Sequence, residues 1–358
     1  MIMAEKANQH FVPRLLLKRF SNSAGKVNIF DTSSGEIIND VPYRPQCAKR
    51  YFYGSDLIIE NHLGNLESVV DRIISHIING NIALNINSEA HIKLVVFSAY
   101  QYIRTPEAIS WANNVIRKYI KTLILKDKDV LIDLMKEKIE NDFEQVIDDS
   151  VYEDFLSSLD VSLQSPHKLL FDSANEFVFE LINFDFLLLR NETEQKFFIS
   201  DHPLVLIGPN KNNKRTLLLP FSQEFILIFF EEGAYDNYVE NSGVISITEL
   251  DDVDSLNKLQ YLNSNKNIYF SDEVSDEYIK KVHKDNECEK LKDKFSYVAE
   301  DGKLFIRRNN IDFELDLNCL KNTSVNYKEE SQSVVLSLEQ ISFLAENGYL
   351  LEPDNDEL

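Results

Sequence analysis

The chain has 358 residues, of which 44% are apolar and 27% charged, and its 59 acidic and 37 basic side chains give a net charge of -22. The apolar and charged fractions are those of a folded globular protein, so they do not fit a chain that is mostly disordered. The negative field repels polyanions, and we therefore expect no non-specific binding to duplex nucleic acid.

The three cysteines are Cys47, Cys288 and Cys319. Their spacing matches no zinc or redox motif, and an odd number argues against a disulfide framework. The N-terminus has no apolar leader segment, and no apolar run reaches the roughly 18 residues that a membrane span needs. These features predict free thiols in a reducing cytoplasm and no association with a membrane.

Residues 10–56 predict a short opening turn or helix followed by a β-hairpin. The segment KVNIF at 26–30 is typical of a strand, DTSSGE of a turn, and EIIND at 36–40 of the start of the return strand. Three prolines in this region exclude one long helix.

From about residue 57 to 182, apolar residues recur every three to four positions, which predicts a series of helices. The first helix carries one apolar stripe. The second begins after Ser88, a good N-cap, and runs to about Ile103. It is apolar on nearly all sides, so we expect it at the centre of the core. Further helices are expected to start at Pro106 and Pro166, with two or three others between them.

Between residues 184 and 275, short apolar runs alternate with turn-length polar segments, as in an antiparallel sheet. FDFLLLR at 184–190 and KFFIS at 196–200 are expected to pair as a hairpin across NETE. Helices are expected at about 250–264 and 276–292. The later segment YVAEDGKLFIRR predicts another hairpin, because its Asp-Gly pair suits a tight turn.

The fold class that these elements predict is α+β: a helical N-terminal half packed on a mostly antiparallel sheet, with further helices and a late hairpin. No linker rich in Pro, Gly or Ser divides the chain, so we expect one domain over residues 1–325. It is mainly helical at 57–182 and mainly sheet at 184–275. Residues 326–358 are expected to form a C-terminal appendage, with a helix after Ser337 and an acidic tail.

Polar residues within apolar segments mark the candidate sites. His10 precedes a Phe-Val-Pro turn, where its imidazole either braces the turn or serves as a general base or metal ligand. Glu67 lies beside the apolar stripe of its helix, as a solvated flank or as a site carboxylate. Asp201 interrupts two apolar runs, where it either stops the sheet through an Asx-turn or places a carboxylate at a sheet end.

Arg104 ends the apolar second helix, so its guanidinium needs a partner. It either covers the terminal carbonyls and pairs with a carboxylate, or it binds a phosphate or carboxylate of a substrate. Gln101 lies one turn earlier on the same face and can share either role.

These motifs resemble those of a widespread, mostly bacterial family of domains of unknown function. The family shows a His-Tyr/Phe-Val-Pro opening, a central Arg-Thr-Pro and a Ser/Thr-Asp-x-Pro motif. The matching segments are HFVPRLLLKRF at 10–20, CAKRYFYG at 47–54, the segment from Glu60 to Glu67, YQYIRTP at 100–106 and ISDHP at 199–203. The resemblance covers roughly residues 8–275. His202 departs from it, since the family more often has Asn there, and no shared role is assigned to it. The resemblance implies a common fold and candidate positions, but no activity.

The leading hypothesis is a metal-dependent hydrolase of a phosphate-bearing substrate, for example a nuclease in a bacterial defence or toxin role. His10, Glu67 and Asp201 would act as the catalytic residues and hold a divalent metal ion, which would activate water. P-loop, dinucleotide, zincin, EF-hand and nucleophile-elbow motifs are absent from the sequence.

On the substrate side, Arg104 and Gln101 would bind the phosphate, and Arg14 and Arg19 would form a basic lip around it. The alternative is a non-enzymatic interaction protein that binds a partner protein. In that case the same polar residues form a buried structural network. The sequence does not indicate an oligomeric state.

Overall fold

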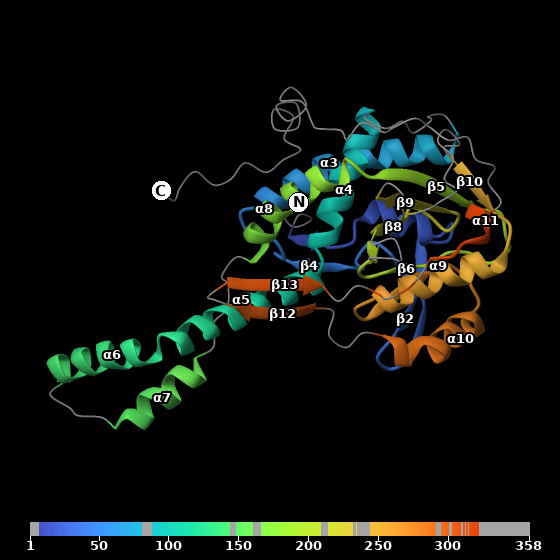
Figure 1. Cartoon of the computed structure of the whole chain (residues 1–358). Coiled ribbons are helices and arrows are strands. Elements are labelled where there is room, and N and C mark those ends of the chain that lie inside the picture. The colour runs from blue at the N-terminus through green and yellow to red at the C-terminus, as the bar shows by residue number, and fades with distance from the viewer. Residues whose placement is uncertain are drawn as a thin grey trace. The chain divides into compact units, whose positions relative to one another are not determined.

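The computed structural model describes residues 7–80, 88–143, 148–159, 166–208, 214–231, 234, 244–290, 295–300, 303–308, 311, 313 and 315–321. The chain divides into two compact units. The first comprises residues 1–107, 167–292 and 310–358, and the second comprises residues 108–166 and 293–309. The predicted appendage at 326–358 lies outside the described residues. Figure 1 follows the elements along the chain.

The first unit begins with short strands and helices. They are β1 (Asn8–His10), α2 (Arg14–Leu17), η1 (Lys18–Phe20), β2 (Lys26–Asp31), β3 (Ile37–Pro42) and β4 (Ala48–Arg50). β1 pairs antiparallel with β4, which places His10 opposite Ala48. Pro13 precedes α2 with φ -66° and an extended ψ of 148°, so the chain enters the helix directly from the Phe-Val-Pro turn. β2 and β3 form the expected hairpin.

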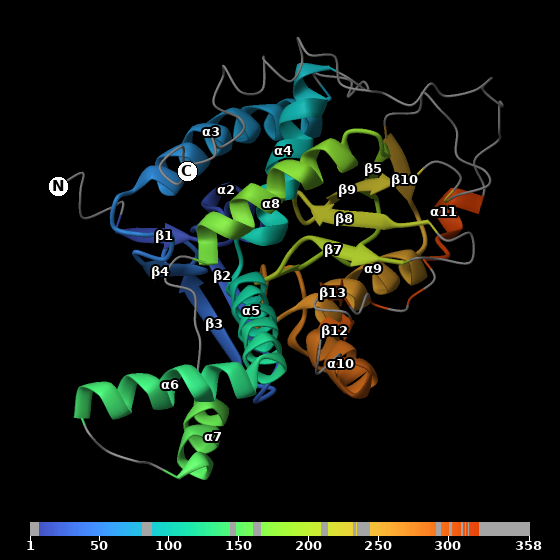
Figure 2. The same ribbon diagram turned by 60° about the vertical axis from the view of Figure 1, so that its left-hand side comes forward.

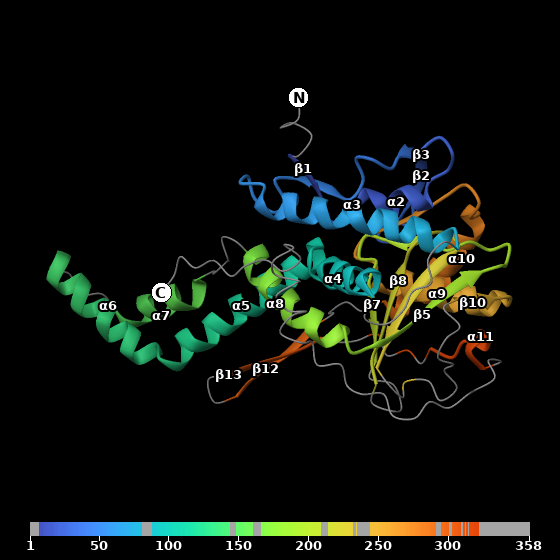
Figure 3. The same ribbon diagram turned by 90° about the horizontal axis from the view of Figure 1, so that it is seen from above.

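Three helices of the first unit are α3 (Ile58–Ile78), α4 (Glu89–Ile103) and α8 (Pro166–Leu181). The apolar stripe of α3 is buried, and α2 lies beside α3 (Figure 3). Ser88 caps α4 by accepting a hydrogen bond from the backbone N–H of His91 at 3.2 Å. α4 is buried on most sides, as its sequence predicted, and Tyr100 packs against Phe171 of α8 with ring centroids 5.3 Å apart.

The larger sheet has five strands in the order β10-β5-β9-β8-β7. Their bounds are β5 (Asp185–Asn191), β7 (Val205–Ile207), β8 (Thr216–Pro220), β9 (Phe225–Phe230) and β10 (Val244–Ile247). The ladders are antiparallel except for β10, which pairs parallel to β5. On one face, His91 of α4 stacks on Phe186 of β5 with ring centroids 4.9 Å apart, so α4 covers that face (Figure 2).

The smaller sheet has the order β3-β2-β11-β6, with β6 (Ile199–Ser200) and β11 (Asn267–Phe270). The helices α9 (Leu250–Asn263) and α10 (Asp276–Asn286) flank β11 in the sequence, and η2 (Glu287–Glu289) follows α10. α9 contacts β6, β7 and β10, so it touches both sheets.

The hairpin expected between 184–190 and 196–200 is wrong. β5 pairs with β9 and β10 in the larger sheet, whereas β6 pairs with β11 in the smaller one. The backbone N–H groups of Phe198 and Ser200 are bound instead by the side-chain oxygens of Asn257 and Gln260 on α9. Because these amides satisfy the donors of the second segment, it does not need β5 as a partner.

The second unit contains most of α5 (Pro106–Lys126) together with α6 (Lys128–Phe143), α7 (Asp149–Ser158), β12 (Phe295–Glu300) and β13 (Lys303–Arg308). Ile132, Tyr152 and Leu156 form a small core between α6 and α7. β12 and β13 form the expected late hairpin. The short helix α11 (Asn318–Lys321) belongs to the first unit. The α+β class is therefore confirmed. Among the described helices, none is long and apolar enough to cross a membrane.

Candidate functional site

His10 stands at the end of β1, only 9% exposed. Its Nε2 lies 2.8 Å from the carbonyl oxygen of Arg44, and Nε of Arg14 approaches the same Nε2 at 3.2 Å. Burial is the main reason that the pKa of His10 is lowered to about 4. The hydrogen bond with Arg44 opposes this shift, and the charges of Arg14 and Arg104 reinforce it. His10 is therefore neutral at neutral pH.

Arg104 follows the last turn of α4 and is 1% exposed. Its Nε donates to Oε1 of Gln101 at 2.8 Å, and its Nη1 donates to Oε1 of Glu67 at 2.6 Å. Gln101 in turn donates from Nε2 to the carbonyl of Phe11, in the turn that follows His10. The structure thus joins Arg104, Gln101 and Glu67 to the Phe-Val-Pro turn through one chain of hydrogen bonds.

The second terminal nitrogen of Arg104, Nη2, is enclosed and has no hydrogen-bond partner among the residues that the structure describes. Buried polar groups without a partner are rare in native proteins, and an ion, a water molecule or a ligand is one explanation. Two side chains of this region reach solvent: Glu67, at 23% side-chain exposure, and the exposed Arg14. Arg104 therefore keeps one donor for a bound acceptor.

Tyr53 completes this group, which we call the Arg104 cluster (His10, Arg14, Tyr53, Glu67, Gln101 and Arg104). Its hydroxyl lies 3.0 Å from the carbonyl of His10 and 3.3 Å from the carbonyl of Arg104. Burial raises the pKa of Tyr53 far above its usual value, so the phenol stays protonated and donates. Sequence reasoning did not select Tyr53. The segment YFYG was visible as a motif, but nothing in it indicated that the hydroxyl of Tyr53 reaches the backbone carbonyls of both His10 and Arg104.

Arg19 does not join the Arg104 cluster through any contact between described residues. It is bound to α3, where Nη1 pairs with Oδ1 of Asp71 at 2.7 Å and Nη2 donates to Oγ of Ser75 at 2.8 Å. These contacts therefore place Arg19 at α3, and they do not bring it next to Arg14 in the predicted basic lip.

Asp201 follows β6 and has a different set of partners. Oδ1 accepts from the backbone N–H of Asn265 at 2.8 Å, and Oδ2 accepts from those of Lys266 and Asn267 at 2.9 and 3.0 Å. These bonds hold the turn between α9 and β11. The carboxylate stabilises the backbone of this turn by accepting its N–H groups. This corresponds to the alternative in which Asp201 has a structural role.

His10, Glu67 and Asp201 were predicted to bind one metal ion. Within the described part of the chain, no three His, Cys, Asp or Glu side chains are grouped so that they could hold a metal ion. Glu67 instead binds Arg104, and Asp201 binds the backbone after α9. The proposed metal roles of these three residues stay a prediction.

Two of the sequence motifs meet directly. Oγ1 of Thr105, from the Arg-Thr-Pro motif, lies 2.7 Å from Nδ1 of His202, from the Ser-Asp-His-Pro motif, and both side chains are buried. No shared role was assigned to His202 from the sequence, because the family more often has Asn at this position. Its contact depends on how α4 meets the end of β6, which the sequence does not reveal.

The family model with the description "Protein of unknown function (DUF4238)" matches residues 8–274. This range includes every residue of the Arg104 cluster and confirms the resemblance to a family of unknown function. No curated protein and no solved structure matches the chain.

Proposed function

The chain belongs to the DUF4238 family, and we propose that it binds a phosphate-bearing substrate at the Arg104 cluster and hydrolyses it. One observation carries the proposal: Nη2 of Arg104 is enclosed and has no hydrogen bond to any described residue, whereas Nε and Nη1 of the same guanidinium are both bonded. Leaving a buried donor unsatisfied costs about 1–3 kcal/mol, and a ligand oxygen would remove this cost. A phosphate suits the site because its anionic oxygens accept strong, charge-assisted hydrogen bonds from a guanidinium N–H group.

Glu67 and Gln101 keep the guanidinium in place. They bind Nη1 and Nε, so the plane of the fork is held and Nη2 is presented in one direction. This leaves one strong donor for the substrate. Arg14, whose Nε lies beside His10, supplies a second positive charge near the solvent. The cluster is thus arranged to attract an anion and to orient one of its oxygens.

His10 is the candidate general base. In the free protein its low pKa of about 4 makes it a weak base. A bound phosphate would offset the charges of Arg14 and Arg104, so it would raise the pKa of His10 and strengthen the base when the substrate is present. In the reaction, the oxygen of water bonds to phosphorus and the bond to the leaving oxygen breaks. His10 takes the proton from water and returns it to the leaving group.

The test uses the full chain with inorganic phosphate as the binding probe and bis(p-nitrophenyl) phosphate as the substrate, with and without EDTA. We expect phosphate to raise the melting temperature of the wild type and p-nitrophenol to be released. Arg104→Lys keeps the charge but removes the fork, so it should lose the phosphate shift and at least about tenfold of the activity. The measurement with EDTA shows whether the predicted metal ion takes part in the hydrolysis.

Arg190→Lys is the matched control, because Arg190 lies on β5 with 55% side-chain exposure and is paired only loosely with Glu192 at 3.9 Å. It should behave as the wild type. An equal phosphate shift in wild type and Arg104→Lys would overturn the binding site. A phosphate shift without release of p-nitrophenol would overturn the hydrolysis step alone.

The second candidate is a non-enzymatic interaction protein in which the motif residues are structural. The three backbone bonds of Asp201 and the buried contact of Thr105 with His202 favour it. Under this alternative, Arg104→Lys lowers the melting temperature, and neither phosphate nor the substrate changes it in any variant. The acidic chain would then bind a basic partner protein. In a binding assay, the immobilised chain would retain a positively charged protein, and added salt would release that protein.

A further inference from the structure

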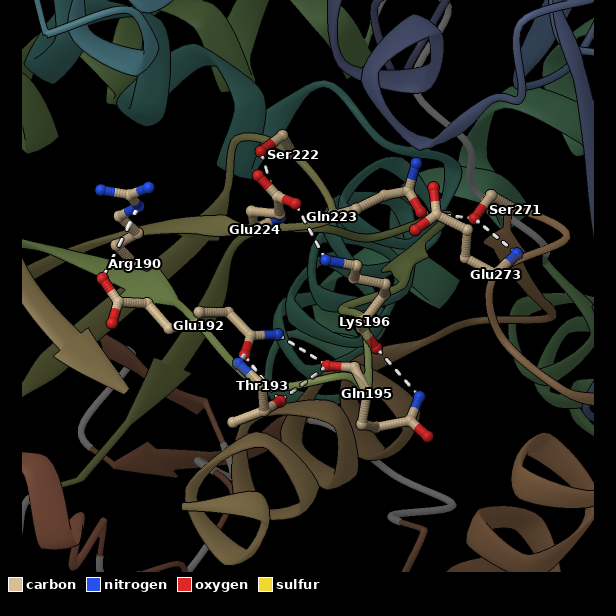
Figure 4. A network of polar contacts seen from close by, with 11 residues as sticks. Arg190, Glu192, Thr193, Gln195, Lys196, Ser222, Gln223, Glu224, Ser271 and Glu273 are labelled. Atoms are coloured by element: carbon tan, nitrogen blue, oxygen red, sulfur yellow. Dashed lines mark hydrogen bonds and ion pairs between the residues drawn. The ribbon is translucent and has the colours of Figure 1, made fainter. Parts of the chain in front are cut away.

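A separate cavity of about 340 Å³ lies in the first unit, away from the residues of the Arg104 cluster. Five segments line it: η1, the C-terminal end of α3, the loop before β6, the turn between β8 and β9, and the loop after β11. Figure 4 shows Lys196 beside Glu224, with Gln223, Ser271 and Glu273 next to them. Its volume is at the lower end of the range for small-molecule sites.

Two cations, Arg19 and Lys196, and two carboxylates, Glu224 and Glu273, line the cavity. Arg19 is paired with Asp71 at 2.7 Å, and Lys196 is paired with Glu224 at 2.8 Å. Glu273 is the remaining charged residue of the lining, and its carboxylate makes no ion pair or hydrogen bond with any residue in the described ranges. Each lining cation therefore has a carboxylate partner, in one case Asp71 from outside the lining, and the exposed Glu273 has none among the described residues.

The end of α3 adds to this negative potential. Ser75, Ile78 and the C-cap residue Asn79 line the cavity, and the C-terminus of a helix carries a partial negative charge. Arg19 binds α3 before this end, where its Nη2 donates to the carbonyl of Asp71 at 3.0 Å and to Oγ of Ser75 at 2.8 Å. The partial negative charge of this helix end favours a cation bound in the cavity.

Neutral groups of the lining offer further polar contacts. The side-chain oxygen of Gln223 accepts from Ser271, while its Nε2 has no partner among the described residues. The Oγ of Ser222 accepts from the backbone N–H of Glu224 at 3.2 Å, which leaves its own hydroxyl hydrogen for a ligand. A ligand with a cationic end and a polar remainder would match both sets of groups.

We propose that this cavity binds a small aliphatic amine in its protonated form, with the ammonium group at Glu273 and the second oxygen of Glu224. The juxtaposition of an unpaired carboxylate with the end of α3 is the basis of this assignment. The site is independent of the proposed phosphate site, since Glu273 and Gln223 take no part in the Arg104 cluster.

The experiment compares three probes of equal chain length: butane-1,4-diamine, butane-1,4-diol and butanedioate. Each is added to the full chain at 10 mM in 150 mM NaCl, and binding is followed by thermal melting and calorimetry. We expect the diamine to raise the melting temperature by about 2 °C. The diol and the dicarboxylate should have no effect. Equal shifts from diamine and diol would overturn the proposal.

Variants then separate the site from general attraction to an acidic protein. Glu273→Gln should weaken diamine binding about fivefold or more. Glu192→Gln is the control: it removes the same charge from a half-exposed position outside the lining and should not change binding. Lys196→Met frees Glu224 from its partner, so it should strengthen binding.

Equal weakening by Glu273→Gln and Glu192→Gln would show that the diamine follows only the overall charge, and the assigned site would be wrong. Absence of any diamine effect on wild type and on Lys196→Met would overturn it as well. Each variant is first melted without a probe, so that a change in its own stability is not mistaken for a change in binding.

Discussion

Nη1 of Arg104 lies 2.6 Å from Oε1 of Glu67, and this bond connects the end of α4 with the middle of α3. The two partners differ in burial, with 1% side-chain exposure for Arg104 and 23% for Glu67. The guanidinium cannot lose its charge, so its stability in the interior depends on this carboxylate and on Gln101.

Glu67→Ala should lower the free energy of unfolding by about 2 kcal/mol, because it leaves a buried cation without its charged partner. Urea denaturation followed by circular dichroism measures the change. Glu192→Ala removes one end of a loose surface pair and should stay within about 0.5 kcal/mol of the wild type. A loss no larger for Glu67→Ala than for Glu192→Ala would contradict the structural importance of the pair.

Asp201→Asn should destabilise the protein by about 1–3 kcal/mol. The carboxylate accepts three backbone N–H groups, two of them on Oδ2, and an amide has only one oxygen to offer. At least one donor after α9 is then unsatisfied. Asp272→Asn, at an exposed position, serves as the matched control. The measurement is the urea midpoint of each variant, and indistinguishable midpoints for the two substitutions would refute this account.

Stability should fall as the pH is lowered from about 6.5 to about 4. Burial lowers the pKa of His10, His91 and His167 to about 4 each. Between these two pH values the unfolded chain binds more protons than the folded chain, so acid favours unfolding. Above pH 6.5 the histidines are neutral in both states, and their contribution to the stability is complete. His91, which is fully buried, should account for about 2 kcal/mol at pH 5.

His91→Phe tests this assignment, since the ring can still pack on Phe186 while its titration is removed. The free energy of unfolding, measured at pH 5 and pH 8, should differ less in the variant than in the wild type. The same pH dependence in both proteins would mean that His91 does not titrate on unfolding.

The thiols of Cys47 and Cys288 should react at different rates. Cys47 is buried and burial raises its pKa, whereas Cys288 is exposed. Iodoacetamide at pH 8 should therefore modify Cys288 within minutes and Cys47 only after unfolding, because the thiolate is the reactive form. Mass spectrometry of the digested protein, with and without urea, identifies the modified peptides. Rapid labelling of Cys47 in the native protein would disagree with its burial.

Local patterns were sufficient for much of the fold. The 3.6-residue period predicted α3 and α4, and Ser88 was recognised as a cap because its hydroxyl can accept a bond from the backbone of the helix that it precedes. These signals lie within one segment of the chain. Strand partners do not, and so the expected pairing of 184–190 with 196–200 failed once Asn257 and Gln260 of α9 bound the second segment.

The residues of the candidate site also differ in how far the sequence predicted their contacts. Residue type and apolar context selected His10, Glu67, Gln101 and Arg104, and the hydrogen bonds place the last three together beside the turn after His10. Nothing local could show that Asp201 would brace the backbone after α9, because that turn lies more than 60 residues further along the chain.

The sequence by itself determined the class of the fold, most helices and the positions where a buried charge would need a partner, because periodicity, capping and desolvation act within short segments. Only the tertiary structure decided which partner each charge received. It also decided that Glu273, which has no ion pair with any described residue, would line one cavity together with the end of α3. Ion pairs and cavities form between segments that meet only after the core has packed, and their geometry therefore leaves no local signal in the sequence.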